Sequence, residues 1–255
     1  MRIFILIFFT IANLYATLPD TQIVKNQQIQ TLDDFEGEFE VSDKNHAKEI
    51  DPLYGYNKMM TNINDKFYIH MLNPVAKAYK GVLPKPIRKG IDNFLDNLMY
   101  PMRLLNNLLQ LKFKNSYLET QRFLLNSTIG IAGFIDVAND NFHIKQHPED
   151  FGQTLGFYGI GDGFYIVLPL LGPSNLRDSV GIIADSIINP STYMENRGYN
   201  LFDNSTEALG VTIEKTINYS SLHVGEYKKL KKDAIDLYPF LKNIYEQRRK
   251  KEISE

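Results

Sequence analysis

The 255-residue chain contains no cysteine. A disulfide framework is therefore excluded, and an ordinary packed core has to hold the fold, which a chain of this length can bury. Without a cysteine after the N-terminal hydrophobic segment, an acyl anchor of the bacterial lipoprotein kind is not expected either.

Tryptophan is also absent, whereas the chain has 15 Tyr and 16 Phe. An aromatic belt at a membrane interface would therefore have to use tyrosine. The formal net charge is only −2, which predicts no overall attraction to nucleic acid or to anionic surfaces. Nucleic acid is not expected as a partner.

The motifs of common hydrolases and metalloenzymes are missing, since neither G-x-S-x-G nor H-E-x-x-H occurs. His143 and His147 have the i, i+4 spacing of a metal pair, but Pro148 follows and favours a turn. The glycine-rich segment from Gly156 to Gly161 resembles a phosphate loop only loosely, because no G-K-[ST] follows it. The sequence therefore predicts no enzyme, no metal site and no cofactor, and a secreted phospholipid hydrolase of unfamiliar design stays open as an alternative.

The N-terminal 50 residues differ from the rest of the chain. Arg2 and the apolar run after it, closed by the small residue Ala16, are typical of a secretory signal peptide at residues 1–16. The run is too short to span a bilayer. Residues 17–50 are acidic with little to bury, and we expect them to form a disordered leader.

From Asp51 onward, apolar residues recur at steps of three and four, which predicts amphipathic helices. Asp51 is expected to cap the first helix, with Pro52 in its first turn. Asn73-Pro74 should interrupt it, and a second segment should run to Pro84. The apolar positions of the two segments are Leu53, Tyr56, Met60, Ile63, Phe67, Val75, Tyr79 and Val82.

The segment between Pro86 and Phe113 is markedly apolar, and Pro101 should kink it. Its wide apolar stripe suits a helix in a membrane interface and equally a helix at the centre of a bundle. The stripe alone leaves both interpretations open. The residues expected to face the membrane in the first case are Phe94, Leu98, Met102, Leu105 and Leu109.

Ser116 and Glu119 have the spacing of a capping box and predict the start of a further helix. After this helix, Gly130 and Gly133 indicate close backbone packing. Asp136, at the apolar edge of the same segment, needs a partner if it is buried.

The stretch from Phe151 to Pro173 combines many glycines with aromatic residues. Glycine at this density marks backbone that bends tightly or lies against another part of the protein. A loop so long and apolar is a poor exposed connector, so it should be buried in protein or face lipid. Within this stretch, Asp162 is expected to lie in a turn.

Three more helices are expected after this stretch. Ser174 should cap the first, which Asn189-Pro190 should end, and Asn204 should begin the second. Residues 221–255 are expected to form a basic amphipathic helix, whose lysines either favour the helix dipole or dock on a partner or anionic lipid. No repeat or strand-rich region is evident, so the region from residue 51 to 220 should be one mainly helical domain.

Several short segments carry a resemblance to a known family, in the family's order, over residues 50 to 220. They are DPLYGYN at 51–57, LPKP at 83–86, Asn93-Phe94, RFLLN at 122–126, GFIDVA at 133–138, FGQTLG at 151–156, Tyr158-Gly159, Gly161, Gly163, Leu168-Pro169, LRD at 176–178 and Ala184-Asp185. Together they resemble the MlaA (VacJ) family of outer-membrane lipid-asymmetry proteins. Typical members are lipoproteins with a cysteine after the signal, and this chain departs from them there.

The resemblance implies an all-α fold, a single ring-shaped helical domain with amphipathic interface helices in the inner leaflet of a Gram-negative outer membrane, at its periplasmic face. It implies that mislocalised phospholipids leave the outer leaflet through an amphipathic channel, which maintains lipid asymmetry. A soluble periplasmic carrier similar to MlaC would collect them, and a porin trimer would hold the protein. A porin-binding scaffold without transport stays open as an alternative.

The resemblance also assigns residues to the lipid channel or its gate. They are Gly130, Gly133, Phe134, Asp136, Gly156, Tyr158, Gly159, Gly161, Asp162, Arg177, Asp178 and Asp185. The charged ones either line the channel or form buried ion pairs, with Arg177 pairing with Asp136 or Asp185 to hold helices together. Spacing alone leaves both open.

Overall fold

The computed structural model describes residues 51–188 and 205–255, with side chains at 51–188 and 213–255. These residues belong to one unit, residues 50–255. The expected signal peptide and leader lie outside the described residues, as do the helix stop at Asn189-Pro190 and the helix start at Asn204.

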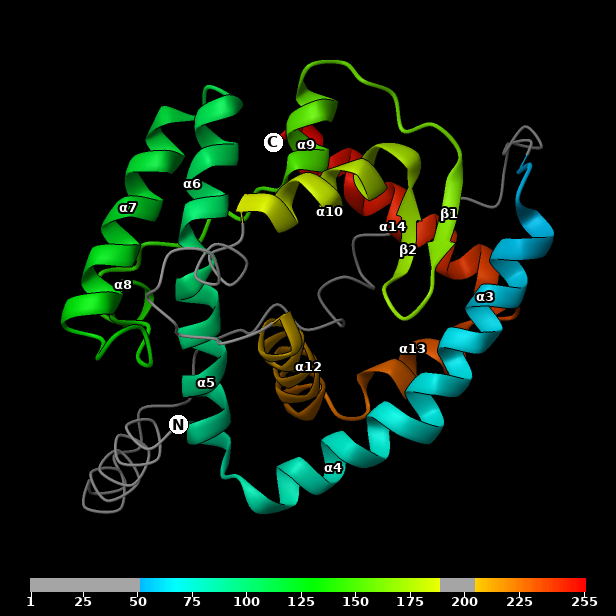
Figure 1. Cartoon of the computed structure of the whole chain (residues 1–255), viewed down its shortest axis with the longest axis horizontal. Coiled ribbons are helices and arrows are strands. Elements are labelled where there is room, and N and C mark those ends of the chain that lie inside the picture. The colour runs from blue at the N-terminus through cyan, green and yellow to red at the C-terminus, as the bar shows by residue number, and fades with distance from the viewer. Residues whose placement is uncertain (1–50, 189–204) are drawn as a thin grey trace. The chain divides into compact units, whose positions relative to one another are not determined.

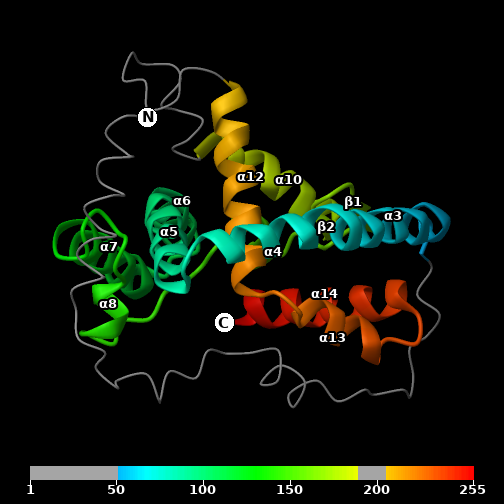
Figure 2. The same cartoon turned by 90° about the horizontal axis from the view of Figure 1, so that it is seen from below.

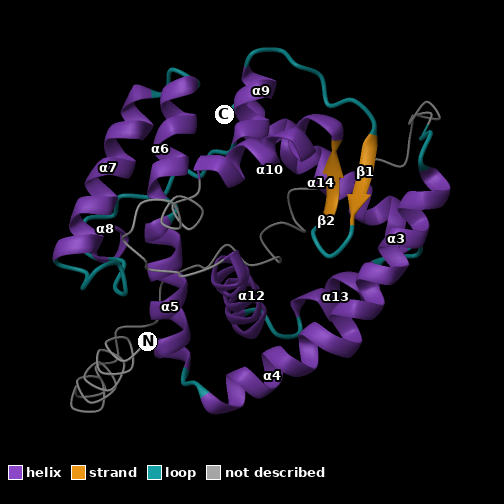
Figure 3. Cartoon of the chain, in the orientation of Figure 1, coloured by secondary structure: helices purple, strands orange, loops and turns teal. Residues whose placement is uncertain are grey.

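Helices dominate this unit, which confirms the expectation of a mainly helical fold (Figures 1 and 3). The first half contains α3 (Tyr54–Phe67), the π-helix η1 (Tyr68–Leu72), α4 (Asn73–Val82), α5 (Lys85–Leu98), α6 (Tyr100–Leu109), α7 (Phe113–Thr128) and α8 (Val137–Asp140). The second half contains α9 (Phe151–Phe157), β1 (Tyr165–Leu168), β2 (Gly172–Asn175), α10 (Leu176–Ile188), α12 (Ser205–Leu222), α13 (Glu226–Asp233) and α14 (Leu237–Ser254).

Helices α3 and α4 follow one another without a break, so the expected interruption at Asn73-Pro74 is wrong. The turn of π-helix before Pro74 carries a bond from Asn73 N to Tyr68 O, and this wider turn accommodates a residue without an N–H. Asp51 does not cap α3 either. Its carboxylate accepts from Leu53 N and from the Tyr238 hydroxyl, and the helix begins at Tyr54.

The expected kink at Pro101 is a break between two helices. Helix α5 ends at Leu98, and Pro101 lies in the first turn of α6, where a missing N–H costs nothing. The expected capping box at Ser116 and Glu119 is wrong, because both residues are buried inside α7, which begins at Phe113. Arg103 takes the Glu119 carboxylate for an ion pair instead.

The stretch from Phe151 to Pro173 is not one loop. It consists of α9, an irregular segment at residues 158–164, and a hairpin in which Tyr165 pairs with Asn175 and Leu168 with Gly172. Two asparagines of α3 bind the other edge of β1. Asn57 donates to Tyr165 O and accepts from Val167 N, and Asn64 binds Leu168 O and Leu170 N.

Helix starts in the second half also differ from the expectation. Asn175, not Ser174, caps α10, because the Asn175 Oδ1 accepts from Asp178 N at 2.7 Å. The region expected as one basic helix contains α13 and α14, separated at Ala234, which is extended, and Asp236 caps α14 by accepting from Tyr238 N.

The contacts between helices form a closed cycle. They run from α4 to α12, to α5, to α6, to α9, to α14, and back to α3, which continues into α4. Figure 2 shows α12 running across the direction of α3 and α4, with α13 and α14 together on one side of them. A small apolar core joins β1, α14 and α3 and contains Tyr165, Val167, Tyr238, Tyr245 and Met60.

Candidate functional site

In the described part of the chain, the usual distribution of polar and apolar side chains between surface and interior is reversed. The buried side chains of α5, α6 and α7 are mostly polar, whereas large apolar side chains are exposed on α6, α7 and α10. Charged and amide groups are rarely buried unless they are paired, and large exposed apolar surfaces mark interaction with a membrane or a partner. The buried polar residues of these three helices are Arg88, Asn97, Arg103, Asn106, Asn107, Ser116, Glu119, Arg122 and Asn126.

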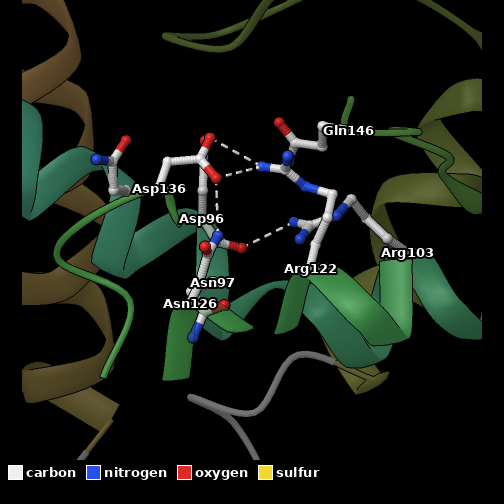
Figure 4. Close-up of a pocket in the computed structure, with 8 residues that line it drawn as sticks. Asp96, Asn97, Arg103, Arg122, Asn126, Asp136 and Gln146 are labelled. Carbon is white, nitrogen blue, oxygen red and sulfur yellow. Dashed lines mark hydrogen bonds and ion pairs between the residues drawn. The ribbon is translucent and has the colours of Figure 1, made fainter. Parts of the chain in front are cut away.

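A polar cavity of about 30 Å³ lies among these helices (Figure 4). Its lining residues are Asn93, Asp96, Asn97, Arg103, Arg122, Asn126, Asp136 and Gln146. Figure 4 shows the Arg122 guanidinium pointing at the Asp136 carboxylate, and the Arg122 Nη2 donates to both carboxylate oxygens, at 3.0 and 2.9 Å. This volume suits about one water molecule, so the cavity is too small for a lipid headgroup.

Asp136, expected to need a partner, has several. Besides Arg122, Asn126 Nδ2 donates to it at 2.9 Å, and it caps the short helix α8 by accepting from Asn139 N. Gly133 packs beside this cluster, with a positive φ of 99° and with Asn97 against the position of its missing Cβ. The expected pairing of Arg177 with Asp136 is therefore wrong.

A second group of buried charges joins α9, α10 and α14. Asp178 accepts from Arg177 Nε at 3.0 Å, from Arg249 Nε at 2.8 Å and from the Tyr245 hydroxyl. Arg249 continues to Asp150, the N-cap of α9, with bonds of 2.8 and 2.9 Å. Arg249 and Tyr245 thus hold the C-terminal helix α14 against α9 and α10.

These ion pairs and hydrogen bonds set the pKa values of Asp178 and Arg249. Burial by itself raises the pKa of Asp178, but hydrogen bonds from Arg249 and Tyr245 outweigh it and hold that pKa below its ordinary value. Burial by itself lowers the pKa of Arg249. The hydrogen bonds to Asp150 and Asp178 have the larger effect and raise that pKa above its ordinary value. The stabilisation from Asp178 is present above the ordinary carboxyl pKa of about 3.9 and is lost as the pH falls through the folded-state pKa.

Asp185 lies apart from Arg177, so their expected pairing is also wrong. Its carboxylate accepts from Asn106 Nδ2 and from Phe151 N, both at 3.0 Å, and joins α10 to α6 and α9. Burial raises the pKa of Asp185. Arg177 pairs instead with Asp162 of the segment at residues 158–164.

The expected channel glycines fall into two classes. A Cβ on Gly130 would lie 2.2 Å from Ile135 O, and one on Gly156 would lie 2.8 Å from Ile253 Cδ1, so both allow close packing. At Gly159 and Gly161 a Cβ would meet nothing within 4 Å, although Gly159 has a positive φ. Tyr158, beside them, is anchored through its hydroxyl, which donates to Leu109 O at 2.6 Å.

The residues expected to face a membrane differ in exposure. The Phe94 ring stacks on that of Phe134, with centroids 4.8 Å apart, so part of its surface is used inside the protein. Leu105 and Leu109 are exposed, and Leu98 and Met102 are half-buried. Lipid contact at these five positions stays a prediction.

Sequence reasoning missed the buried polar side of the helices, including Arg103, Glu119, Arg122 and Arg249. A local signal did exist, since Arg103, Asn106 and Gln110 recur at helical spacing and all three are buried. Such a stripe is ordinarily a solvated face, and only the docking of α6 on α7 and α9 places it inside.

Comparisons with known proteins agree with this architecture. The family model described as "MlaA lipoprotein" matches residues 49–252. The chain is 40% identical over 139 residues to the "Intermembrane phospholipid transport system lipoprotein MlaA" of Escherichia coli (strain K12), and the aligned part covers 53% of this chain and 55% of that protein. The protein of the same name from Haemophilus influenzae is 32% identical over 151 residues, with 57% and 60% covered. The chain thus spans just over half the length of these curated relatives.

A solved structure is also similar. A chain described under "Structural basis for maintenance of bacterial outer membrane lipid asymmetry" has a TM-score of 0.66 and 31% sequence identity, and the match covers 80% of this chain and 99% of that one. The relatives are named lipoproteins, whereas the 255 residues here contain no cysteine.

Proposed function

The chain belongs to the MlaA lipoprotein family, and from this premise we propose that it removes mislocalised phospholipids from the outer leaflet of an outer membrane and passes them to a soluble periplasmic carrier. The relatives from Escherichia coli and Shigella flexneri are named for intermembrane phospholipid transport, and their names describe no catalytic activity. Transport without covalent chemistry is consistent with a sequence in which neither G-x-S-x-G nor H-E-x-x-H occurs.

The observation that carries the proposal is the reversed polarity. A protein that lies among acyl chains can expose leucine and isoleucine, and its polar side chains must then find partners inside. The exposed apolar residues of α6 and α10 and the buried ion pairs of α7 and α14 follow this rule. A polar interior beside an apolar exterior would let a headgroup move through the protein while its acyl chains stay in lipid.

Membrane attachment would use helix faces. Within residues 51–188 and 205–255, no helix is both long enough and apolar enough to cross a bilayer. Apolar helix faces in the interface bind in proportion to the area that they bury, so no spanning helix is needed. A porin trimer is a further proposed partner, and Leu105, Leu108 and Leu109 on α6 are candidates for either contact.

The proposal is tested by lipid analysis. Phospholipid should co-purify with protein extracted in mild detergent, and loss of the gene should raise the phospholipid content of the outer leaflet, measured by head-group labelling of intact cells. No bound lipid together with an unchanged outer leaflet would refute it. Turnover of phospholipid by the purified protein would instead support the hydrolase, and lipid-free protein that still binds a porin would support the scaffold.

A charge on the apolar surface should release the protein from membranes. We expect Leu171→Glu with Ile183→Glu to reduce binding to phosphatidylethanolamine–phosphatidylglycerol vesicles at least about tenfold in flotation, because an acidic side chain is costly in hydrocarbon. Ile235→Glu is the control, since Ile235 is 107% exposed but lies between α13 and α14, next to the lysines of α13. Equal losses in both proteins would contradict a localised membrane face.

A further inference from the structure

Arg177 is a buried cation at the base of an exposed loop. Its side chain is only 3% exposed and lies beneath residues 158–164, with Nη1 paired with Asp162 and 3.4 Å from Ile160 O. A Cβ on Gly156 would come within 3.2 Å of the same nitrogen. Nε binds Asp178, and Nη2 is buried without a hydrogen-bond partner among the described residues. One donor of this guanidinium is thus unused.

Asp162, the partner of Arg177, is accessible. Its side chain is 45% exposed, and in the described structure Arg177 is the group that its carboxylate binds. The loop around it is open at its tip, because a Cβ on Gly159 or Gly161 would meet no atom within 4 Å. The backbone at Asp162 is fixed, since its carbonyl oxygen accepts from Arg177 N at 3.2 Å. The Asp162 side chain can therefore rotate into solvent while its backbone and the arginine stay in place.

We propose that Arg177 binds the phosphodiester of a phospholipid, and that Asp162 occupies this binding group when no lipid is present. The inference rests on the proposed function and names the side chain that recognises the headgroup. In it, the lipid phosphate displaces the Asp162 carboxylate from the guanidinium, and the aspartate side chain rotates into solvent.

The exchange is consistent with the charges involved. When Asp162 leaves, Arg177 keeps only Asp178, an anion that it shares with Arg249, so a second anion at Nη1 is favoured. A phosphodiester carries one negative charge, as a carboxylate does, and its oxygens fit the planar fork of arginine. It could also accept from Nη2, which Asp162 leaves unused.

The surroundings suit the rest of a phospholipid. The loop and its flanks expose four apolar or aromatic side chains, which can contact the glycerol and the first acyl carbons. They are Phe157, Tyr158, Ile160 and Phe164.

Two other buried arginines lack this arrangement. Arg249 binds Asp150 through two nitrogens and also contacts Asp178 and Glu252, whereas Arg122 binds both oxygens of Asp136. Of these three arginines, Arg177 alone pairs with a carboxylate on an exposed glycine-rich loop.

The test compares Asp162→Asn with the unaltered protein in binding dioleoyl phosphatidylglycerol, measured by native mass spectrometry in detergent. Removing the internal anion should tighten binding about tenfold, as expected for loss of a charge-assisted competitor. Binding of dioleoylglycerol, which has no phosphate, should not change. Asp140→Asn, the same change at an exposed aspartate of α8, should leave both affinities unaltered.

Arg177→Lys keeps the charge but loses the fork, and it should weaken phosphatidylglycerol binding and cancel the gain from Asp162→Asn. If that variant does not fold, Asp162→Asn alone decides. Equal phosphatidylglycerol binding by the unaltered protein and Asp162→Asn would overturn the inference and leave the proposed function standing. No binding by either protein would overturn both, and a gain for inorganic phosphate but not for the lipid would reassign the site to free phosphate.

Discussion

Replacing Arg249 by methionine is expected to lower the free energy of unfolding by about 3 to 5 kcal/mol, the usual cost of removing one partner from a buried ion pair. The Arg249 side chain is 8% exposed and binds Asp178 and Asp150, so the change leaves two carboxylates short of a cation in the contact between α14, α9 and α10. Unfolding by guanidinium chloride in mild detergent, monitored by circular dichroism, measures this loss.

The neighbouring arginine provides the control. Arg248 is 50% exposed and pairs with Glu252 one turn away, so Arg248→Met should cost less than about 1 kcal/mol. Equal unfolding free energies for the two variants would show that the charges between α9, α10 and α14 do not stabilise the fold.

Replacing Gly133 by alanine should cost about 3 kcal/mol, because two penalties act together. The residue has a φ of 99°, a conformation that strains any L side chain, and a Cβ would lie 2.6 Å from Asn97 Cβ. Asn97 cannot easily withdraw, since its amide donates to Ser127 Oγ at 2.9 Å. The same denaturant titration gives the change.

Gly161→Ala is the matched control, because its Cβ would meet nothing within 4 Å and its φ is ordinary. We expect a change below about 0.5 kcal/mol there, as for other exposed positions. A large loss at Gly161 would mean that the loop at residues 158–164 is packed against something, which would also weaken the proposed movement of Asp162.

Local sequence signals predicted much of the helical content. The steps of three and four from Leu53 to Phe67 identified α3, and Pro101 marked the division between α5 and α6. Predictions of helix caps were wrong where the capping side chain binds a distant residue in the folded protein. Ser116 and Glu119 have the letters of a capping box, yet Arg103 on another helix takes the glutamate.

Buried ion pairs were one of the two interpretations that the sequence left open. Arg177 and Asp178 do form such pairs, but the expected partners were wrong, because Arg122 supplies the cation for Asp136 and Arg177 binds Asp162. The hairpin was missed because the run from Phe164 to Leu171 has no clear alternation. Its pairing depends on the turn and on the amides that α3 offers to β1.

Periodicity and short motifs are local properties, so they were enough to predict most of the helices, their apolar faces and the family of the chain. Which face lies inside and which charges meet depend on the packing of the helices. Arg249 and Asp150 are 99 residues apart along the chain, and no spacing rule connects them. The reversal of polarity has the same origin, since an amphipathic helix has the same pattern whether its polar side faces water or buried ion pairs.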